Sequence, residues 1–271
     1  MVDVMTTING LDVHYTIVHP KQQKTIVLLH GFTGSSTTWQ QLMAKLPANY
    51  RIIALDLIGH GLSAAPKQVQ HYTMEEQVSI LHTFFQERQI STATVIGYSM
   101  GGRVALAFAM QYPECIDKLI LESASPGLAA REDREVRMQH DELLAARITE
   151  DGIEAFVDYW QDLALFTSQK TLPIQMQQAI RTERLQQSAC GLANSLRGMG
   201  TGQQKSYWSS LSQLSKPVVL LVGELDTKFC SIAEKMAEHL LDSTVIKVSR
   251  VGHAIHVENP ESFATIIKDQ L

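Results

Sequence analysis

The amino-acid sequence predicts an α/β protein with a mostly parallel, twisted β-sheet, helices on both of its faces and an inserted helical cap. Two observations indicate this fold class. Short apolar runs alternate with helical patterns along the chain, which is typical of successive βαβ units. The alternation stops for about 80 residues in the middle of the chain, a stretch too long for a loop. With 271 residues, the chain can form one large domain that carries such an insertion.

The strands of the predicted sheet are short, continuously apolar runs, as expected for parallel strands that are covered on both faces. Six runs have this character: Thr25–His30, Arg51–Leu57, Ala93–Gly97, Lys118–Glu122, Pro217–Gly223 and Thr244–Val251. An earlier segment, Val2–Thr16, contains Asn9-Gly10 between β-favouring residues. This dipeptide indicates a hairpin, which we place at an antiparallel edge of the same sheet.

Helical patterns between these runs connect the strands through right-handed crossovers. They cover Met74–Gln86, Gly101–Gln111, Cys230–Leu241 and Pro260–Asp269. From residue 127 to residue 207 there is no strand-like run, but there are three helical stretches, Arg131–Arg147, Gly152–Leu165 and Ile174–Leu185. We therefore expect a core domain of residues 1–126 and 208–271 and a helical cap of residues 127–207.

Composition excludes several classes of function. The 23 basic and 28 acidic side chains give a net charge of −5, which argues against a nucleic-acid partner or an anionic membrane surface. No apolar run is long enough for a signal sequence or a membrane span. The three cysteines form no C-x-x-C pair, so we expect neither disulfides nor a cysteine-based metal site, and we place the protein in the cytoplasm.

The segment Gly97–Gly102 is the first that indicates a catalytic residue. It follows a predicted strand, opens a predicted helix and has the pattern G-x-S-x-G around Ser99. Glycines on both sides of the serine permit the tight strand-to-helix turn that exposes a nucleophile. The alternative is a glycine-rich turn in which Ser99 only caps the helix.

Candidate partners for this serine follow in the chain. Asp226 comes directly after one predicted strand and His253 directly after the last one. The order Ser, Asp, His is that of a hydrolase triad in which the histidine accepts the serine proton and the aspartate orients the imidazole. Glu224 and Asp242 are alternative acids, and we favour Asp226 because the turn after its strand directs it across the active face.

A further glycine-rich turn, His30-Gly31-Phe32, closes the first parallel strand. The backbone N–H groups of Phe32 and Met100 are the candidate donors of an oxyanion hole. We expect His30, and also His60 after the next strand, to be structural. These segments together resemble the α/β-hydrolase superfamily, which hosts many reactions, so the fold does not fix the chemistry.

Arg103 lies one helical turn beyond Ser99, which places a cation on the nucleophile's side of the helix. A polyanionic substrate needs such a group and a neutral ester does not. The cap contains several more arginines, but its net charge is not positive. We expect most of them to form surface ion pairs, such as Arg137 with Asp141.

Motifs in the cap and near the triad resemble one family, the 2-succinyl-6-hydroxy-2,4-cyclohexadiene-1-carboxylate synthases of menaquinone biosynthesis. The matching segments are Glu122–Leu128, Arg137–Glu142, Trp160 with Leu165-Phe166, Gly191–Gly202, Gly223–Phe229 and Gly252–Pro260. The resemblance implies pyruvate elimination from a small polycarboxylate, with neither a metal nor an organic cofactor. By motif position it implies that the substrate is bound by Arg103, Arg137, Arg184, Tyr98 and Trp160.

Three functions remain to be weighed. The resemblance favours a lyase in which Ser99, His253 and Asp226 abstract a ring proton. The same triad also fits a serine hydrolase of esters, thioesters or C–C bonds. A binding module without activity is disfavoured because all three triad residues and both donor loops are intact. For either enzyme we expect a monomer or a small homo-oligomer.

Overall fold

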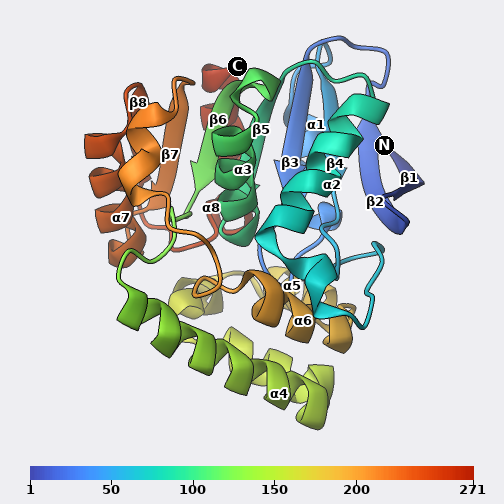
Figure 1. Ribbon diagram of the computed structural model, residues 1–271. Helices are drawn as coiled ribbons and strands as arrows, with labels where there is room; N and C mark the ends of the chain where they lie inside the picture. The colour runs from blue at the N-terminus through green and yellow to red at the C-terminus, as the bar shows by residue number, and fades with distance from the viewer.

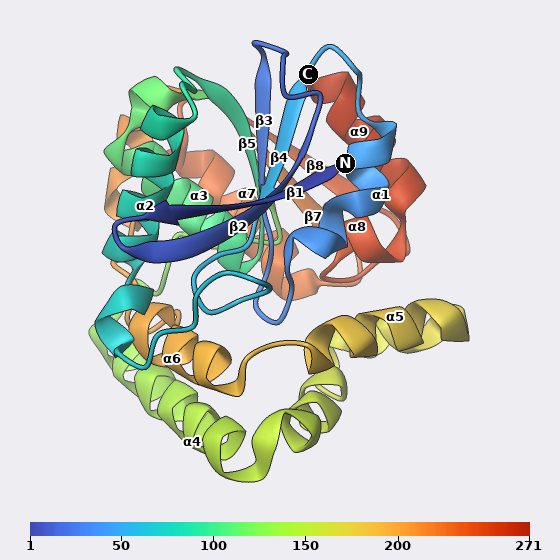
Figure 2. The ribbon, with the colours of Figure 1, turned by 90° about the vertical axis from the view of Figure 1, so that its right-hand side faces the viewer.

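The computed structural model describes residues 1–271. An eight-stranded sheet runs through the molecule in the order β1-β2-β4-β3-β5-β6-β7-β8 (Figures 1 and 2). Only the β1–β2 and β2–β4 pairs are antiparallel, and all other neighbours are parallel. This confirms the predicted fold class. The strands are β1 Val2–Ile8, β2 Leu11–Val18, β3 Thr25–Leu29, β4 Arg51–Leu55, β5 Ala93–Tyr98, β6 Ile116–Glu122, β7 Val218–Gly223 and β8 Ser243–Val248.

The predicted hairpin is present at one edge of the sheet. Ile8 pairs with Leu11 across a two-residue turn. Asn9 and Gly10 both have positive φ, 50° and 80°, as a type I′ turn requires, and this turn matches the twist of the strands that it joins. The hairpin is therefore determined by its local sequence.

Helices cover both faces of the sheet (Figure 2). One face carries α2, α3 and α7, and the other carries α1, α8 and α9. Their bounds are α1 Gln40–Lys45, α2 Met74–Glu87, α3 Met100–Gln111, α7 Thr227–His239, α8 Ile255–Glu258 and α9 Pro260–Gln270. None of the helices combines the length and the apolar character needed to cross a bilayer.

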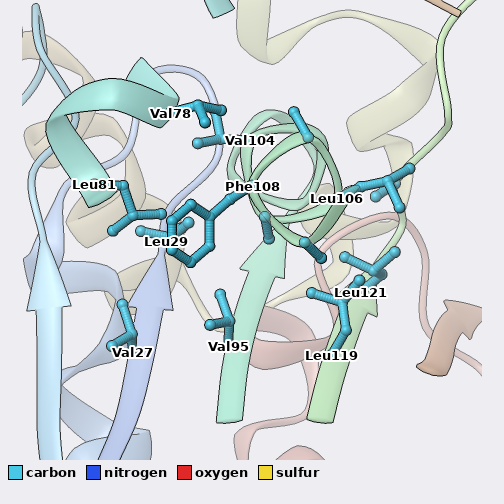
Figure 3. Close-up of a cluster of buried hydrophobic side chains, with 14 of the residues drawn as sticks. Val27, Leu29, Val78, Leu81, Val95, Val104, Leu106, Phe108, Leu119 and Leu121 are labelled. Carbon is cyan, nitrogen blue, oxygen red and sulfur yellow. The ribbon is translucent and has the colours of Figure 1, made fainter. Parts of the chain in front are cut away.

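Two separate cores explain why the strands are apolar at every position. Along β3, Val27 and Leu29 face the core under α2 and α3, together with Val95 and Phe108 (Figure 3). The intervening Ile26 and Leu28 belong to the core on the opposite face. Because successive side chains of a strand point to opposite faces, a strand covered on both sides needs apolar residues throughout.

The predicted strands agree with the structure except at the far edge. β8 is only partly buried because no strand lies beyond it, although Val245 and Ile246 still pack against the cores on its two faces. The short helix α1 was not predicted. Its six residues are too few to give a clear helical period.

Between β6 and β7 the chain forms only helices and turns, which lie beyond the carboxyl ends of the parallel strands (Figure 1). Two of the expected helices meet in α4 and are separated by a kink at Gly152, whose φ of 83° is not helical. One further helix, α6, was not predicted. The elements of this segment are α4 Arg131–Gln161, the 3-10 segment η4 Ala164–Thr171, α5 Ile174–Leu185 and α6 Ala189–Met199.

The helices of this segment have a small apolar core of their own. It contains Ile148 and Val157 from α4 and Leu192 from α6. Phe32, from the loop after β3, packs against this cluster and also against the large core under α2 and α3. The inserted helices therefore contact the sheet domain at the loop that carries a candidate oxyanion donor.

Candidate active site

Ser99 occupies the turn between β5 and α3 in a strained backbone conformation, with φ 49° and ψ −105°. Gly97 and Gly101 make this turn possible. A Cβ atom on Gly101 would lie 2.3 Å from the carbonyl oxygen of Leu29, and one on Gly97 would lie 2.5 Å from that of Gly101. The G-x-S-x-G pattern is therefore required by the close approach of the helix to the sheet, and the turn leaves the Ser99 hydroxyl facing a cavity.

The structure brings Ser99, His253 and Asp226 together. The Nε2 atom of His253 lies 3.0 Å from the Ser99 Oγ atom, and its Nδ1 atom lies 2.6 Å from the Asp226 Oδ2 atom. His253 is 2% exposed and Asp226 is 8% exposed. With the proton on Nδ1, the imidazole donates to the carboxylate, and Nε2 is free to accept the serine proton.

The alternative acids do not contact His253. Glu224 is exposed, and its carboxylate accepts a hydrogen bond from the Arg250 N–H. Asp242 also lies away from the ring, and its backbone carbonyl accepts from Val218 in the strand pairing. A second hydrogen bond holds Asp226 in place: its Oδ1 atom accepts the Phe229 N–H at 3.2 Å and so caps α7.

The two candidate oxyanion donors border the same cavity as Ser99. Met100 is the first residue of α3, ahead of the first intrahelical hydrogen bond, from the Arg103 N–H to the Ser99 carbonyl oxygen. The N–H groups of a first helical turn are free to bind an anion. The Phe32 N–H has no acceptor within the protein, so both donors are available to a ligand.

His30 holds the Phe32 loop in place. Its Nε2 atom accepts the Leu57 N–H at 3.0 Å, and its Nδ1 atom donates to the Gly31 carbonyl oxygen at 2.8 Å. Burial lowers the pKa of His30. Burial, together with the neighbouring His30, lowers the pKa of His60 to about 3. Neither ring touches the triad, in agreement with the structural role expected for both.

The cavity at Ser99 has a volume of about 160 Å³. Its lining includes three cations, Arg103, Arg137 and Lys228, and no acidic side chain. The aromatic part of its lining is formed by Phe32, Tyr98, Trp160, Phe166 and Phe229. Cations surrounded by apolar walls suit a substrate with several carboxylates and an apolar body.

Arg103 is a buried cation on α3. Its side chain donates from Nη1 to the Met199 carbonyl oxygen at 2.8 Å and to the Gln204 Oε1 atom at 2.9 Å. Burial and the nearby Arg137 lower its pKa to about 10. The guanidinium is thus fixed by the inserted helices while it lines the cavity.

Arg137 pairs with Asp141 as expected, at 2.8 Å, but the expectation of an ordinary surface pair is wrong. Asp141 is 2% exposed, and Arg137 lines the cavity beside Ser99. The difference arises because the α4 face that carries this pair packs against α6, where Asp141 lies beside Gly200 at the end of that helix. The expectation does hold for Arg131, Arg181 and Arg197, which form ion pairs with exposed carboxylates.

The structure does not bring Arg184 into the cavity at Ser99. Arg184 lines a neighbouring cavity of about 50 Å³, and its Nη2 atom donates to the Gln169 Oε1 atom at 3.1 Å. Its guanidinium stacks on Phe166, 4.7 Å from the ring centroid. Burial lowers the pKa of Arg184. The two cavities share Phe32, Tyr98 and Phe166, so these rings form the wall between Arg184 and the triad.

Tyr98 and Trp160 both line the cavity at Ser99. Burial raises the pKa of Tyr98 well above its usual value, and the neighbouring Glu122 acts in the same direction. The phenol therefore stays neutral and can donate a hydrogen bond. The buried Nε1 atom of Trp160 has no hydrogen-bond partner, so it too is a donor without an acceptor.

Three residues of the site were not singled out from the sequence: Phe166, Lys228 and Phe229. The Phe229 ring lies 4.6 Å from that of His253, and Phe166 lines the cavity from η4. Lys228 and Phe229 lie two and three residues after Asp226, in the first turn of α7. Their closeness to the predicted acid could therefore have indicated that they line the site. No local signal places Phe166, because its position depends on how the inserted helices pack.

Comparisons with known proteins agree with this geometry. The family model described as alpha/beta hydrolase fold matches residues 24–260. A protein of Bacillus subtilis (strain 168), assigned as a 2-succinyl-6-hydroxy-2,4-cyclohexadiene-1-carboxylate synthase, is 43% identical over 93% of this chain and 92% of its own. The synthase of that name from Photorhabdus laumondii is 33% identical over 89% and 83% of the two chains.

Solved structures give the same result. The structure of MenH from S. aureus superposes with a TM-score of 0.90 at 37% identity, covering 93% of this chain and 96% of that chain. An esterase from Thermogutta terrifontis superposes with a TM-score of 0.86 at 24% identity, over 100% and 98% of the two chains, and shares the fold. The chain therefore belongs to the 2-succinyl-6-hydroxy-2,4-cyclohexadiene-1-carboxylate synthase family, on the α/β-hydrolase fold.

Proposed function

We propose that this chain eliminates pyruvate from 2-succinyl-5-enolpyruvyl-6-hydroxy-3-cyclohexene-1-carboxylate, which gives 2-succinyl-6-hydroxy-2,4-cyclohexadiene-1-carboxylate in menaquinone biosynthesis. Family membership supports the reaction. The single structural observation that carries the proposal is a Ser-His-Asp geometry that opens on a cavity with three cations and no acid. A neutral ester would leave the net positive charge of this lining without a counter-charge, whereas this substrate has three carboxylates.

Arg103 and Arg137 are the proposed carboxylate-binding residues beside Ser99. Guanidinium groups form paired, charge-assisted hydrogen bonds with carboxylates, which fix the orientation of the substrate as well as bind it. Tyr98 and Trp160 supply neutral donors and apolar surface. We assign Arg184 a part in binding the end of the substrate that reaches past Phe166, since it lines the adjoining cavity.

The proposed reaction begins with removal of a ring proton by the Ser99–His253 pair. Ser99, with its proton drawn toward Nε2 of His253, acts as the base, and Asp226 stabilises the imidazolium that forms. The electron pair of the broken C–H bond forms one ring double bond, the existing ring double bond shifts by one position, and the C–O bond to the enolpyruvyl group breaks. The departing enolate takes up a proton to give pyruvate, so no water is consumed and no oxidant is needed.

Negative charge develops on the substrate as the proton leaves. The N–H groups of Phe32 and Met100 are the proposed donors that stabilise it. One such donor is typically worth ~3–4 kcal/mol in the transition state. Because the Phe32 N–H has no acceptor within the protein, it loses no bond when it binds the substrate.

We propose that residues 127–207 act as a cap that excludes water from this charged intermediate. The cap supplies Arg137, Trp160 and Phe166 to the cavity lining. The wider setting that we propose is a monomer or small homo-oligomer in the cytoplasm, which fits three free cysteines.

The direct test is pyruvate release from the enolpyruvyl substrate. We expect the wild-type chain to release pyruvate. His253→Ala should lower kcat by at least about a thousandfold, as is typical when one residue of a Ser-His-Asp triad is removed. A thermal melt of each variant shows whether it is folded. Absence of pyruvate release by folded wild-type protein would refute the proposed reaction.

The triad itself is the observation that favours the second candidate, a serine hydrolase. The two mechanisms differ in one covalent step, because hydrolysis passes through an acyl-Ser99 ester and elimination does not. Rapid quenching followed by mass spectrometry of the intact protein separates them. We expect no acyl adduct with the enolpyruvyl substrate, and accumulation of one would favour the hydrolase.

A further inference from the structure

Lys228 lies in the first turn of α7, where a cation opposes the helix dipole. The first turn of α7 contains no acidic residue, and the one carboxylate at this helix start, the N-cap Asp226, is engaged by the Phe229 N–H and by His253. Lys228 makes no ion pair and no hydrogen bond, and its Nζ atom lies over the Phe229 ring, 5.7 Å from the centroid. The Lys228 charge therefore does not stabilise the helix, and we ask instead whether it serves the cavity that it lines.

Lys228 lines a second cavity next to the nucleophile, with a volume of about 220 Å³. Ser99, Arg103 and Arg137 also line this second cavity, and none of its lining residues is acidic. Of its three cations, Arg137 is paired with Asp141 and Arg103 donates to two oxygens of the protein. Lys228 is exposed to solvent and is the cation that has no partner within the protein.

Ser123, in the wall of the same cavity, has two further unusual features. It is fully buried in the wall of the second cavity and has the left-handed φ of 48° that serine rarely adopts. Its Oγ atom has no hydrogen-bond partner. A strained residue with an unpaired buried hydroxyl is a feature that functional sites tolerate and ordinary packing avoids.

We propose that this second cavity is a carboxylate-binding subsite and that Lys228 is the substrate-binding residue that closes on the bound carboxylate. The inference rests on the proposed function and extends it. Lysine suits this role because its flexible stem lets a single point charge follow the ligand, and the Ser123 hydroxyl adds a neutral donor. The carboxylate is either one that the ring retains or the one that leaves in pyruvate.

The test compares Lys228→Met with Lys228→Arg and with Lys235→Met, an exposed lysine on the same helix that lines none of these cavities. For Lys228→Met we expect KM for the enolpyruvyl substrate to rise about tenfold or more, with kcat within about threefold. Lys228→Arg should recover KM to within about threefold, and Lys235→Met should leave it unchanged. The melting temperature of Lys228→Met should not fall, because an unfavourable charge is removed from the helix start.

Inhibition constants identify which carboxylate is bound. If Lys228 holds the leaving carboxylate, Lys228→Met weakens inhibition by pyruvate about tenfold and leaves methyl pyruvate, its neutral ester, unaffected. If it holds a retained carboxylate, inhibition by the diene product weakens while inhibition by pyruvate does not change. Either pattern supports the subsite. An unchanged KM together with unchanged inhibition by both compounds overturns it.

Failure of the proposed function is distinguishable from failure of the subsite. If the wild-type chain releases no pyruvate, titration calorimetry with tricarballylate, a simple tricarboxylate, tests the subsite directly. We then expect Lys228→Met to bind it about tenfold more weakly than wild type and Lys235→Met to bind it equally well. Equal affinity of all three proteins, or no binding by wild type, overturns the subsite. Ser123→Ala should show a smaller loss of affinity, because only a neutral donor is removed.

Discussion

Arg103 is 9% exposed, yet its guanidinium has only two acceptors within the protein, on Met199 and Gln204. Five N–H donors are available on an arginine side chain, so several remain for a ligand. A single residue thereby links the stability of the inserted helices with the binding of substrate. The contribution of Arg103 to stability and its contribution to substrate binding can be separated by substituting either Arg103 itself or its acceptor Gln204.

For Arg103→Lys we expect both properties to be impaired. The shorter ammonium group keeps the charge but cannot reach both oxygens, so the free energy of unfolding should fall by ~1–3 kcal/mol. KM for the enolpyruvyl substrate should rise about tenfold or more, since paired hydrogen bonds to a carboxylate are lost. Denaturant unfolding and pyruvate-release kinetics measure the two effects.

Gln204→Met is the matched control, because it removes one of the acceptors of Arg103 and leaves the guanidinium in place. It should lower stability and leave KM within about threefold of wild type. If Gln204→Met raises KM as much as Arg103→Lys does, Arg103 acts only by supporting the fold.

At the residue scale, much of the site could be predicted from the sequence. Ser99, Asp226 and His253 each follow a strand, and the carboxyl ends of parallel strands meet at one edge. The three residues are therefore close because the strands are parallel, and the alternation of strand and helix patterns along the chain predicts parallel strands. The separate cavity of Arg184 could not be predicted, because it depends on how Phe166 and Tyr98 pack between that arginine and the nucleophile.

At the scale of elements, β2 and the turn after β4 are joined by a buried charged pair. The His14 Nδ1 atom lies 2.8 Å from the Asp56 Oδ2 atom. The hydrogen bond to Asp56 raises the pKa of His14, although burial opposes this. Burial alone would raise the pKa of Asp56, but hydrogen bonds from His14, Leu62 and Ser36 hold it below its usual value.

The shifts of this pair predict how stability depends on pH. A histidine whose pKa is raised by folding contributes its stabilisation fully below the unfolded value of 6.5, and the contribution is lost as pH rises through the folded pKa. The aspartate contribution is present above 3.8 and is lost below it. We expect His14→Gln to lower the free energy of unfolding by ~2 kcal/mol near pH ~6, and by less near pH ~9. Urea unfolding at both pH values checks this. An equal loss at both pH values would mean that His14 is not charged in the folded protein.

The kink of α4 depends on one residue. Gly152 has φ 83° and ψ 175°, a combination open essentially to glycine alone. A Cβ atom there would meet no atom within 4 Å, so any cost of adding one comes from the backbone. We expect Gly152→Ala to lower the free energy of unfolding by ~1–3 kcal/mol, as measured by thermal melting. Glu150→Ala, at an exposed position in the same helix, should be nearly neutral, and the same result for Gly152→Ala would contradict the strain.

The strands and their partners could be predicted well, because a run of roughly four to eight apolar residues between turns is typical of a buried strand. The inserted helices were harder. The sequence indicates two helices separated at Gly152, and the helical backbone of α4 is indeed interrupted at that residue. The helix α6 lies in a segment rich in small residues, which weakens its helical signal.

At the scale of the whole molecule, the inserted helices and the sheet domain are two bodies that meet at the cavity beside Ser99. The apolar cluster of the inserted helices is separate from both cores of the sheet. Several polar links join them: Glu183 of α5 accepts hydrogen bonds from Ser35 and Thr37, Asn194 of α6 donates to the Pro66 carbonyl oxygen, and Arg103 donates to that of Met199. Cations from both bodies, Arg103 and Arg137, meet in the cavity between them. A polyanion bound there would therefore bridge the two bodies.

We expect the diene product to stabilise the whole chain against heat. A ligand at about one hundred times its Kd adds ~2.7 kcal/mol to the free energy of unfolding, which for a protein of this size raises the melting temperature by about 5 °C or more. Differential scanning calorimetry over a range of product concentrations measures this. Sodium chloride at equal ionic strength is the control, and an equal shift with salt alone would show that the product does not bind between the bodies.

Asp226 uses its two carboxylate oxygens for different purposes, one to cap α7 through the Phe229 N–H and one to hold His253. Fraying of the first turn of that helix therefore releases the imidazole at the same moment. The rate at which the Phe229 amide exchanges its hydrogen for deuterium should then report how often the catalytic ring is free to rotate. We therefore expect each local opening of this helix end to coincide with a loss of the contact between Asp226 and His253.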